Sequence, residues 1–264
     1  MTDPWDRANV AAEAAGVEVH RLTTLEEADG ALGVMTATWG EHQLVPRELL
    51  RAFQASGSLF QGAFKGGEMV GFALGFFGFD DAGVHLHSHM LAVMPDARSS
   101  GVGLALKLAQ RAATLDADVG RIRWTFDPLV ARNAYFNLAK LGAVADAFHR
   151  DFYGAMEDLL NRGDRTDRLL ILWDLEAKSS HAEAEGFEVL GRIWPEEAPR
   201  PTEVHAPEGA PALVSIPKDH AELRRSDPGL GAAWREAAAA AFEACFDAGL
   251  VASGFTRDAR YVFT

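Results

Sequence analysis

The residues between Leu91 and Leu104 are suited to binding an anion through their main chain. An apolar stretch runs into a proline, a loop with one arginine and two glycines follows, and a stretch with helical spacing begins at once. The first N–H groups of a helix have no partner within the helix, and the helix dipole places partial positive charge there. Gly101 and Gly103 have no Cβ, so a phosphate can approach the main chain, and Arg98 adds a fixed charge. This spacing predicts a phosphate site, although glycines before a helix also occur in ordinary strand-to-helix turns.

The strand that leads into this loop carries three histidines. His85, His87 and His89 alternate along it, and because successive side chains of a strand point to opposite faces, all three are expected on one face. A histidine with a near-neutral pKa can take a proton from an amine, directly or through water, which makes His87 and His89 candidate general bases. Two imidazoles on one side of a strand can also ligate a metal ion, although no acidic or cysteine ligand is evident nearby. Half-buried structural histidines are the third interpretation.

The wider pattern around the glycines resembles a known motif. Arg98-x-x-Gly101-x-Gly103, directly after Leu-x-Val-x-Pro, resembles the acyl-CoA pyrophosphate loop of the GNAT acyltransferase superfamily. The resemblance implies that acyl-CoA is bound by the main chain at Leu91 and Val93 and by the loop. The loop residues implied are Arg98, Ser99, Ser100, Gly101, Val102, Gly103 and Leu104. Main-chain N–H groups at Leu91–Val93 would polarise the thioester carbonyl.

Two further segments resemble parts of the same superfamily. His87-Leu-His89, followed by Met-Leu-Ala-Val, resembles the paired histidines of arylalkylamine N-acetyltransferases, which implies a catalytic role for both histidines. Asn133-Ala-Tyr-Phe-Asn-Leu-Ala-Lys-Leu-Gly142 resembles the second motif of the superfamily, whose helix lies beside the acyl and thiol end of CoA. The resemblance implies that Asn133 and Phe136 bind the coenzyme.

The leaving thiolate needs a proton, which the family often takes from a tyrosine four residues before the closing glycine of the second motif. This sequence has Leu138 at that position. Tyr135 lies one helical turn earlier, on nearly the same face of an α-helix, so we expect it to be the acid. Tyr153 is another candidate, and the interpretation of Tyr135 as a packing residue of an amphipathic helix stays open.

The elements that position these residues predict an α/β fold with a mixed α+β sheet. Apolar alternation and turn signals predict the strands Val17–Leu22, Leu59–Phe64, Met69–Phe79, Val84–Val93, Arg121–Phe126, Ala143–Tyr153 and Arg168–Leu175. Helical spacing predicts helices that begin near Leu25, Pro46, Leu104 and Arg132. This order resembles the GNAT core. We expect that core at residues 1–176, a linker or long surface loop at 177–211, and an additional C-terminal α/β segment at 212–264, docked on the core.

Composition narrows the range of partners. The 264 residues carry a net charge of −13, which argues against nucleic acid as a partner. Cys245 is the single cysteine, so an internal disulfide is excluded and a reducing compartment is expected. Residues 1–6 are acidic and lack the apolar core of a signal peptide, and no apolar run is long enough to span a bilayer. We expect a cytoplasmic protein with no membrane partner, and a homodimer is compatible with the sequence.

The leading hypothesis is an acyl-CoA-dependent N-acyltransferase of the EC 2.3.1 type. Acetyl-CoA or another acyl-CoA would be the co-substrate, no metal is expected, and a small-molecule amine is the expected acceptor. Transfer would be direct, because no covalent nucleophile lies near the predicted site. Two alternatives stay open: a non-catalytic module that binds acyl-CoA or another small molecule, and a metal-dependent hydrolase built on the histidines.

Overall fold

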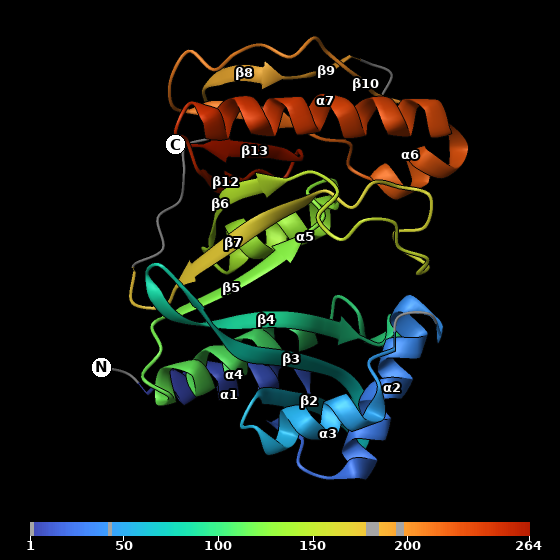
Figure 1. Cartoon of the computed structure of the whole chain (residues 1–264), viewed down its shortest axis with the longest axis vertical. Helices are drawn as coiled ribbons and strands as arrows, with labels where there is room; N and C mark the ends of the chain where they lie inside the picture. The colour runs from blue at the N-terminus through green and yellow to red at the C-terminus, as the bar shows by residue number, and fades with distance from the viewer. Residues whose placement is uncertain (1–2, 42–43, 178–184, 194–197) are drawn as a thin grey trace. The chain divides into compact units, whose positions relative to one another are not determined.

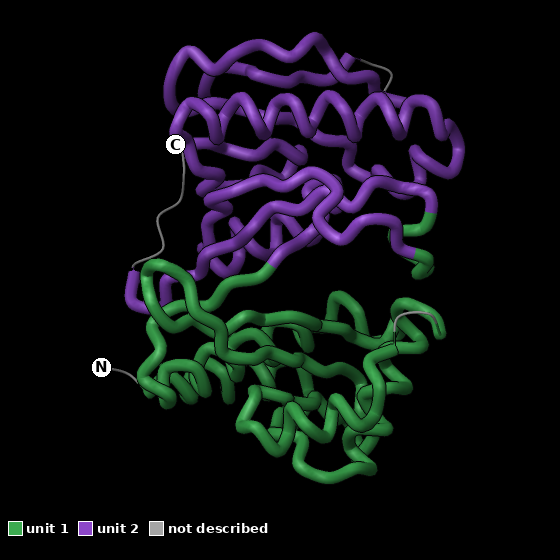
Figure 2. Tube along the Cα trace, viewed as in Figure 1, with its two compact units in different colours: residues 1–124, 157–162 green, residues 125–156, 163–264 purple. Residues whose placement is uncertain are grey.

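A computed structural model of the chain describes residues 3–41, 44–177, 185–193 and 198–264. It contains two compact units (Figure 2). The first unit holds residues 1–124 and 157–162, and the second unit holds residues 125–156 and 163–264. The division falls within β5 (Arg121–Phe126), whereas the sequence analysis placed its boundaries at residues 176 and 211.

The first unit is built on a mixed sheet in the strand order β1-β2-β3-β4-β5, of which Figure 1 labels β2 to β5. Its strands are β1 (Glu18–Arg21), β2 (Leu59–Lys65), β3 (Glu68–Asp80), β4 (Gly83–Val93) and the beginning of β5. β1 to β4 pair antiparallel with their neighbours, and β4 pairs parallel with β5. The five predicted strands in this region are confirmed to within one residue at each end, because their alternation and their turn residues give the same boundaries.

Helices cover both faces of this sheet. α2 (Leu25–Trp39) and α3 (Arg47–Ala55) pack on one face, where Phe60, Phe72 and Met35 are fully buried. α1 (Pro4–Ala15) and α4 (Val102–Asp116) pack on the other face, where Ala63, Ala73 and Leu106 are buried. Neighbouring residues of a strand point to opposite faces, which is why Phe72 and Ala73 belong to different layers.

α1 is absent from the predicted elements, although its start and stop signals are in the sequence. Asp3 accepts a hydrogen bond from the Trp5 amide at 2.9 Å, and Pro4 occupies the first helical position. Gly16 ends the helix in the left-handed conformation at φ +64°. The apolar face of α1 packs on α4, so this helix belongs to the layer that carries the candidate phosphate loop.

The second unit is built on a sheet in the order β7-β6-β12-β13-β11-β8. Its strands are β6 (Val144–His149), β7 (Arg168–Asp174), β8 (Phe187–Leu190), β11 (Ala212–Ser215), β12 (Ala252–Phe255) and β13 (Arg260–Phe263). Its helices are α5 (Ala131–Ala134), which continues as a π-helical turn at Tyr135–Lys140, α6 (His220–Ser226) and α7 (Pro228–Asp247). β12 pairs with β6 at Ala252 and Ala145, so the C-terminal segment continues the sheet of this unit.

Two stretches of the second unit differ from the expectations. The strand expected over Ala143–Tyr153 ends at His149, because the chain turns at Asp151, which has a positive φ of 47°. The described part of the segment expected as a linker at 177–211 contains β8, β9 (Arg192–Ile193) and β10 (Arg200–Pro201). β8 pairs parallel with β11 and buries Val189 and Leu190, a short apolar run that proline-rich and glutamate-rich neighbours obscure in the sequence.

In the described part of the chain, no helix combines the length and apolar character needed to cross a membrane.

Candidate functional site

The candidate phosphate loop begins where β4 ends. A 3₁₀ turn at Pro95–Ala97 and four further residues lead into α4. Gly101 lies directly before the helix in the left-handed conformation, and no side chain caps the helix. In the described part of the chain, Leu104 carries the first amide of this helix that finds an intrahelical acceptor, the Gly101 carbonyl at 3.0 Å. The amides of Val102 and Gly103 are therefore available to an external anion, as the sequence predicts.

Glycine occupies positions 101 and 103 of the loop for two different reasons. Gly101 has a φ of +95°, which side chains of L residues rarely adopt, so its backbone alone explains the glycine. A Cβ on Gly103 would come no nearer than 3.8 Å to Leu91 Cδ2, which is an ordinary contact distance. The packing of the chain does not require glycine at position 103, and its absent side chain keeps the approach to the helix amides open.

The first unit brings the predicted acyl-CoA-binding residues of the loop and strand together. They are Leu91 and Val93 on β4 and Arg98, Ser99, Ser100, Gly101, Val102, Gly103 and Leu104 around the start of α4. Arg98 folds back on the strand, where its Nε donates to the Val93 carbonyl at 3.2 Å. Ser100 Oγ donates to the Ala97 carbonyl at 2.7 Å, so side chains of the loop itself hold its shape.

β4 has one unpaired side next to this loop. Within the first unit β5 pairs with β4 only at Leu86–Ile122 and His87–Arg123, while β3 accompanies β4 as far as Val93. The main chain of β4 after His87 therefore has a strand partner on the β3 side only, among the described residues of this unit. Such a strand edge presents N–H and C=O groups to an extended ligand, which agrees with the expected role of the Leu91–Val93 main chain.

His87 and His89 lie together on the face of β4 that carries α3. Their ring centroids are 6.0 Å apart, and both contact the ring of Phe76 on β3, at 5.1 and 5.8 Å. The register between β3 and β4 shifts between Ser88 and Met90, so His89 is the additional residue of a β-bulge. His85 lies two residues before His87, near the start of the strand, with its Nδ1 3.3 Å from an Asp80 carboxylate oxygen.

The electrostatic surroundings of His87 favour its neutral form. Burial lowers the pKa of His87 to about 4, and positive charge on His89, His85, Lys107 and Arg123 acts in the same direction. Burial likewise lowers the pKa of His89, whose side chain is nevertheless exposed. Both imidazoles are therefore unprotonated at neutral pH and able to accept a proton.

The remaining predicted residues lie together in the second unit. Asn133 is on α5, and Tyr135 and Phe136 begin the π-helical turn that follows it. Leu138 is buried, whereas Tyr135 is half-buried. The prediction that these two positions share a face assumed α-helical spacing, and a turn with i to i+5 hydrogen bonds changes that spacing. The other tyrosine candidate, Tyr153, has its hydroxyl 3.0 Å from Thr125 Oγ1.

The sequence matches a known family over residues 24–139, and the family model is described as that of the Acetyltransferase (GNAT) family. Residues 24–139 form a GNAT-family domain. The matched range starts at the cap of α2 and ends in the π-helical turn, so it includes the histidine strand, the phosphate loop and α4. This confirms, for residues 24–139, the family resemblance drawn from the loop motif, and the matched family is one of acetyltransferases.

Two solved structures are similar to part of this chain. Naa20 from Chaetomium thermophilum, solved with a bisubstrate analogue, is 20% identical, with a TM-score of 0.51 over 61% of this chain and 87% of that chain. The ribosomal-protein-S18-alanine N-acetyltransferase of Escherichia coli is 17% identical, with a TM-score of 0.49 over 65% of this chain and 99% of that chain. No curated protein matches the sequence. The likeness to Naa20 confirms the predicted mixed α/β fold.

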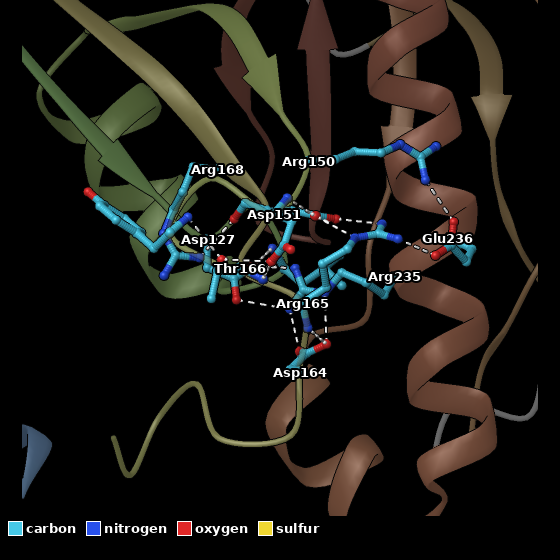
Figure 3. A network of polar contacts seen from close by, with 12 residues as sticks. Asp127, Arg150, Asp151, Asp164, Arg165, Thr166, Arg168, Arg235 and Glu236 are labelled. Carbon is cyan, nitrogen blue, oxygen red and sulfur yellow. Dashed lines mark hydrogen bonds and ion pairs between the residues drawn. The ribbon is translucent and has the colours of Figure 1, made fainter. Parts of the chain in front are cut away.

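A dense network of charged groups lies in the second unit, mostly beyond the GNAT match (Figure 3). Arg235 on α7 is buried, and its Nη1 and Nη2 donate to the two carboxylate oxygens of Asp127 at 2.7 and 3.0 Å. Arg235 Nε donates to Asp164 at 3.2 Å, and Arg224 lies 2.9 Å from the same carboxylate. Asp127 follows β5, and Asp164 lies in the loop that precedes β7. Arg235 therefore ties α7 to the loop after β5 and to the loop before β7.

Sequence analysis missed two of the polar residues that the structure places in the interior. Arg235 lies in an alanine-rich helix, where an arginine usually extends into solvent. Lys107 lies on α4 in a stripe with Gln110 and Thr114, and such spacing is typical of a solvated helix face. Both side chains are buried instead, and only their position in the fold identifies them.

Among the residues that the structure describes, no group of three or more His, Cys, Asp or Glu side chains is placed to hold a metal ion.

Proposed function

We propose that this GNAT protein transfers an acetyl group from acetyl-CoA directly to an amine. The observation that supports the proposal most strongly is the uncapped start of α4 directly after the strand that carries His87 and His89. CoA carries at most four negative charges at neutral pH. Two of them are on its diphosphate, and helix amides bind such a group well. The acidic surface of the chain, with a net charge of −13, supports a cationic amine as the acceptor.

In the proposed reaction the amine nitrogen attacks the thioester carbonyl while the amine loses a proton. The side of β4 that faces away from β3 at Leu91–Val93 is proposed to hold the acyl end of the coenzyme through its main chain and to stabilise the developing oxyanion. His87 or His89, neutral at pH 7, takes the proton directly or through a water molecule. The carbon–sulfur bond then breaks, and the thiolate takes a proton from a group that we propose to be Tyr135.

Direct transfer agrees with the environment of the single cysteine of the sequence. The single cysteine, Cys245, is buried in α7, and burial raises the pKa of its thiol to about 12. A protonated, buried thiol cannot act as an acyl-carrying nucleophile. Binding of both substrates before transfer is therefore proposed, and it predicts kinetics without an acyl-enzyme burst.

The proposal is tested in two steps on the full chain. Isothermal titration with acetyl-CoA and with CoA should give one site per chain, and the absence of binding for both would refute the assignment. Thiol release is then measured with a panel of small primary amines, including arylalkylamines and polyamines. Acetyl-CoA binding without thiol release for any amine would instead support the non-catalytic module, which the leucine at position 138 favours.

A further inference from the structure

Lys107 places an amine in the interior of the first unit without a carboxylate to neutralise it. Its side chain is 3% exposed, and no salt bridge to it occurs among the described residues. Lys107 Nζ donates to Ser88 Oγ at 2.7 Å and lies 3.7 Å from the centroid of the Trp124 ring. A longer contact of 3.5 Å joins it to Gln110 Oε1. A hydroxyl, an aromatic face and an amide oxygen are thus the partners of this buried amine.

The position of Ser88 connects this amine to the candidate catalytic residues. Ser88 lies between His87 and His89 on β4, at the start of the β-bulge. Its hydroxyl points to α4, whereas the two imidazoles lie on the opposite face with Phe76, which stacks on Phe53 of α3. The contact with Lys107 therefore holds the bulged segment from the α4 face of the sheet, opposite to the two imidazoles.

Lys107 also belongs to the helix whose first amides form the phosphate loop, where it lies in the second turn. One rigid helix thus contacts the histidine strand through Lys107 and presents its uncapped end to the proposed diphosphate. Burial lowers the pKa of Lys107 to about 7, a cost that an apolar side chain at this position would not carry. Strongly perturbed ionisable groups of this kind concentrate at functional sites.

We propose that Lys107 is a positioning residue for acyl transfer, which acts through Ser88 to hold the bulged segment that carries His87 and His89. This inference rests on the proposed function. The charged groups near His87 come from three elements: His85 and His89 on β4, Arg123 on β5 and Lys107 on α4. Lys107 is the member of this set that contacts the strand from the α4 side.

The first test needs no turnover. Imidazole signals of His87 are followed by NMR during acid titration of the full chain, in the wild type and in K107M. At the pH where His87 titrates, Lys107 is protonated, so its removal takes away a repelling charge and should raise the His87 midpoint by about half a pH unit or more. T114V is the matched control, since Thr114 is a buried polar residue of the same helix whose hydroxyl donates to the Gln110 carbonyl at 2.6 Å. An unchanged midpoint in K107M would overturn the proposal.

The second test is a double-mutant cycle with S88A, which also provides a variant if K107M folds poorly. Each single substitution should lower kcat about tenfold while KM for acetyl-CoA stays within about twofold, because the diphosphate contacts are retained. The double variant should be no slower than the slower single variant. Losses that multiply would show that Lys107 does not act through Ser88. If the wild type releases no thiol, the proposed function fails, and the NMR titration still decides whether Lys107 controls His87.

Discussion

Ser100→Asp tests the phosphate loop directly, because it should change stability and coenzyme binding in opposite directions. Ser100 is exposed and precedes Gly101, the residue before the uncapped start of α4. A carboxylate near a helix N-terminus stabilises the helix by about 0.3–1 kcal/mol. The same carboxylate repels a bound diphosphate. At about 6 Å and a water-like dielectric, two phosphate charges against one carboxylate cost roughly 1.4 kcal/mol, or about tenfold in Kd.

The assay is isothermal titration with CoA at low and high salt, together with thermal unfolding. S100A is the control, because it removes the hydroxyl bond to Ala97 without adding charge. We expect S100D to bind CoA about tenfold more weakly than S100A at low ionic strength, with the difference shrinking at high salt as the charges are screened. The Tm of S100D should equal or exceed that of S100A. Equal CoA affinity of S100D and S100A at low salt would place the diphosphate elsewhere and remove the main support for the proposed function.

Three further substitutions test other parts of the structure. Because the pKa of His87 is lowered from 6.5 to about 4, the unfolded chain binds an additional proton between these pH values, so stability falls as the pH is lowered across this window. H87Q should flatten that loss in urea unfolding at pH 7 and pH 4.5, and an identical pH dependence would contradict the burial of this imidazole. Y135F should lower kcat for thiol release by about 100-fold or more if Tyr135 is the acid, whereas an equal loss in Y153F alone would transfer the role to Tyr153. R235M leaves the half-buried carboxylate of Asp127 without its Arg235 partner and leaves Asp164 with Arg224 alone of its two arginines, so it should destabilise the fold by about 3–5 kcal/mol in urea unfolding, against about 0.5 kcal/mol for the exposed control R225M.

The sequence was sufficient to predict elements whose local signals agree with the fold. Thr24, Glu26 and Glu27 are start signals of α2 that can be read from the sequence, and the Thr24 hydroxyl accepts from the Glu27 amide at 3.2 Å while Glu27 accepts from the Thr24 amide at 2.9 Å. The phosphate loop was predictable for the same reason, because Gly101 and the helix that follows define a local structure. The shape of the histidine segment was less predictable. Strict alternation places three histidines on one face, but it does not reveal the bulge at His89, which depends on the pairing of β4 with β3.

The second motif shows how a small change in helix geometry limits inference from spacing. The prediction that Tyr135 is the acid rests on its position three residues before Leu138, because an α-helix would place these two side chains next to each other. The structure has a π-helical turn over Tyr135–Lys140, closed by a hydrogen bond from the Leu141 amide to the Phe136 carbonyl at 3.0 Å. Leu138 is buried in the second unit while Tyr135 is half-buried, so the leucine fills a packing position. Sequence patterns do not signal such a turn, because each of its residues is compatible with an α-helix.

The burial of Lys107 could not be predicted from the sequence either, because it depends on how α4 packs against its neighbours. A helix with Ala105, Ala109 and Ala112 on one side and Lys107 and Gln110 on the other would normally place its alanines on a sheet and its polar side chains in solvent. Here α1 covers the alanine side, where Ala105 packs with Ala11 and Ala15, and the polar side faces β4 and β5. Small residues allow two helices to approach closely, so the alanines serve the contact between helices, and Lys107 lies on the side of α4 that faces the sheet. Whether a polar residue on such a helix is solvated or buried thus depends on a neighbouring helix, and α1 is the element that the sequence analysis lacked.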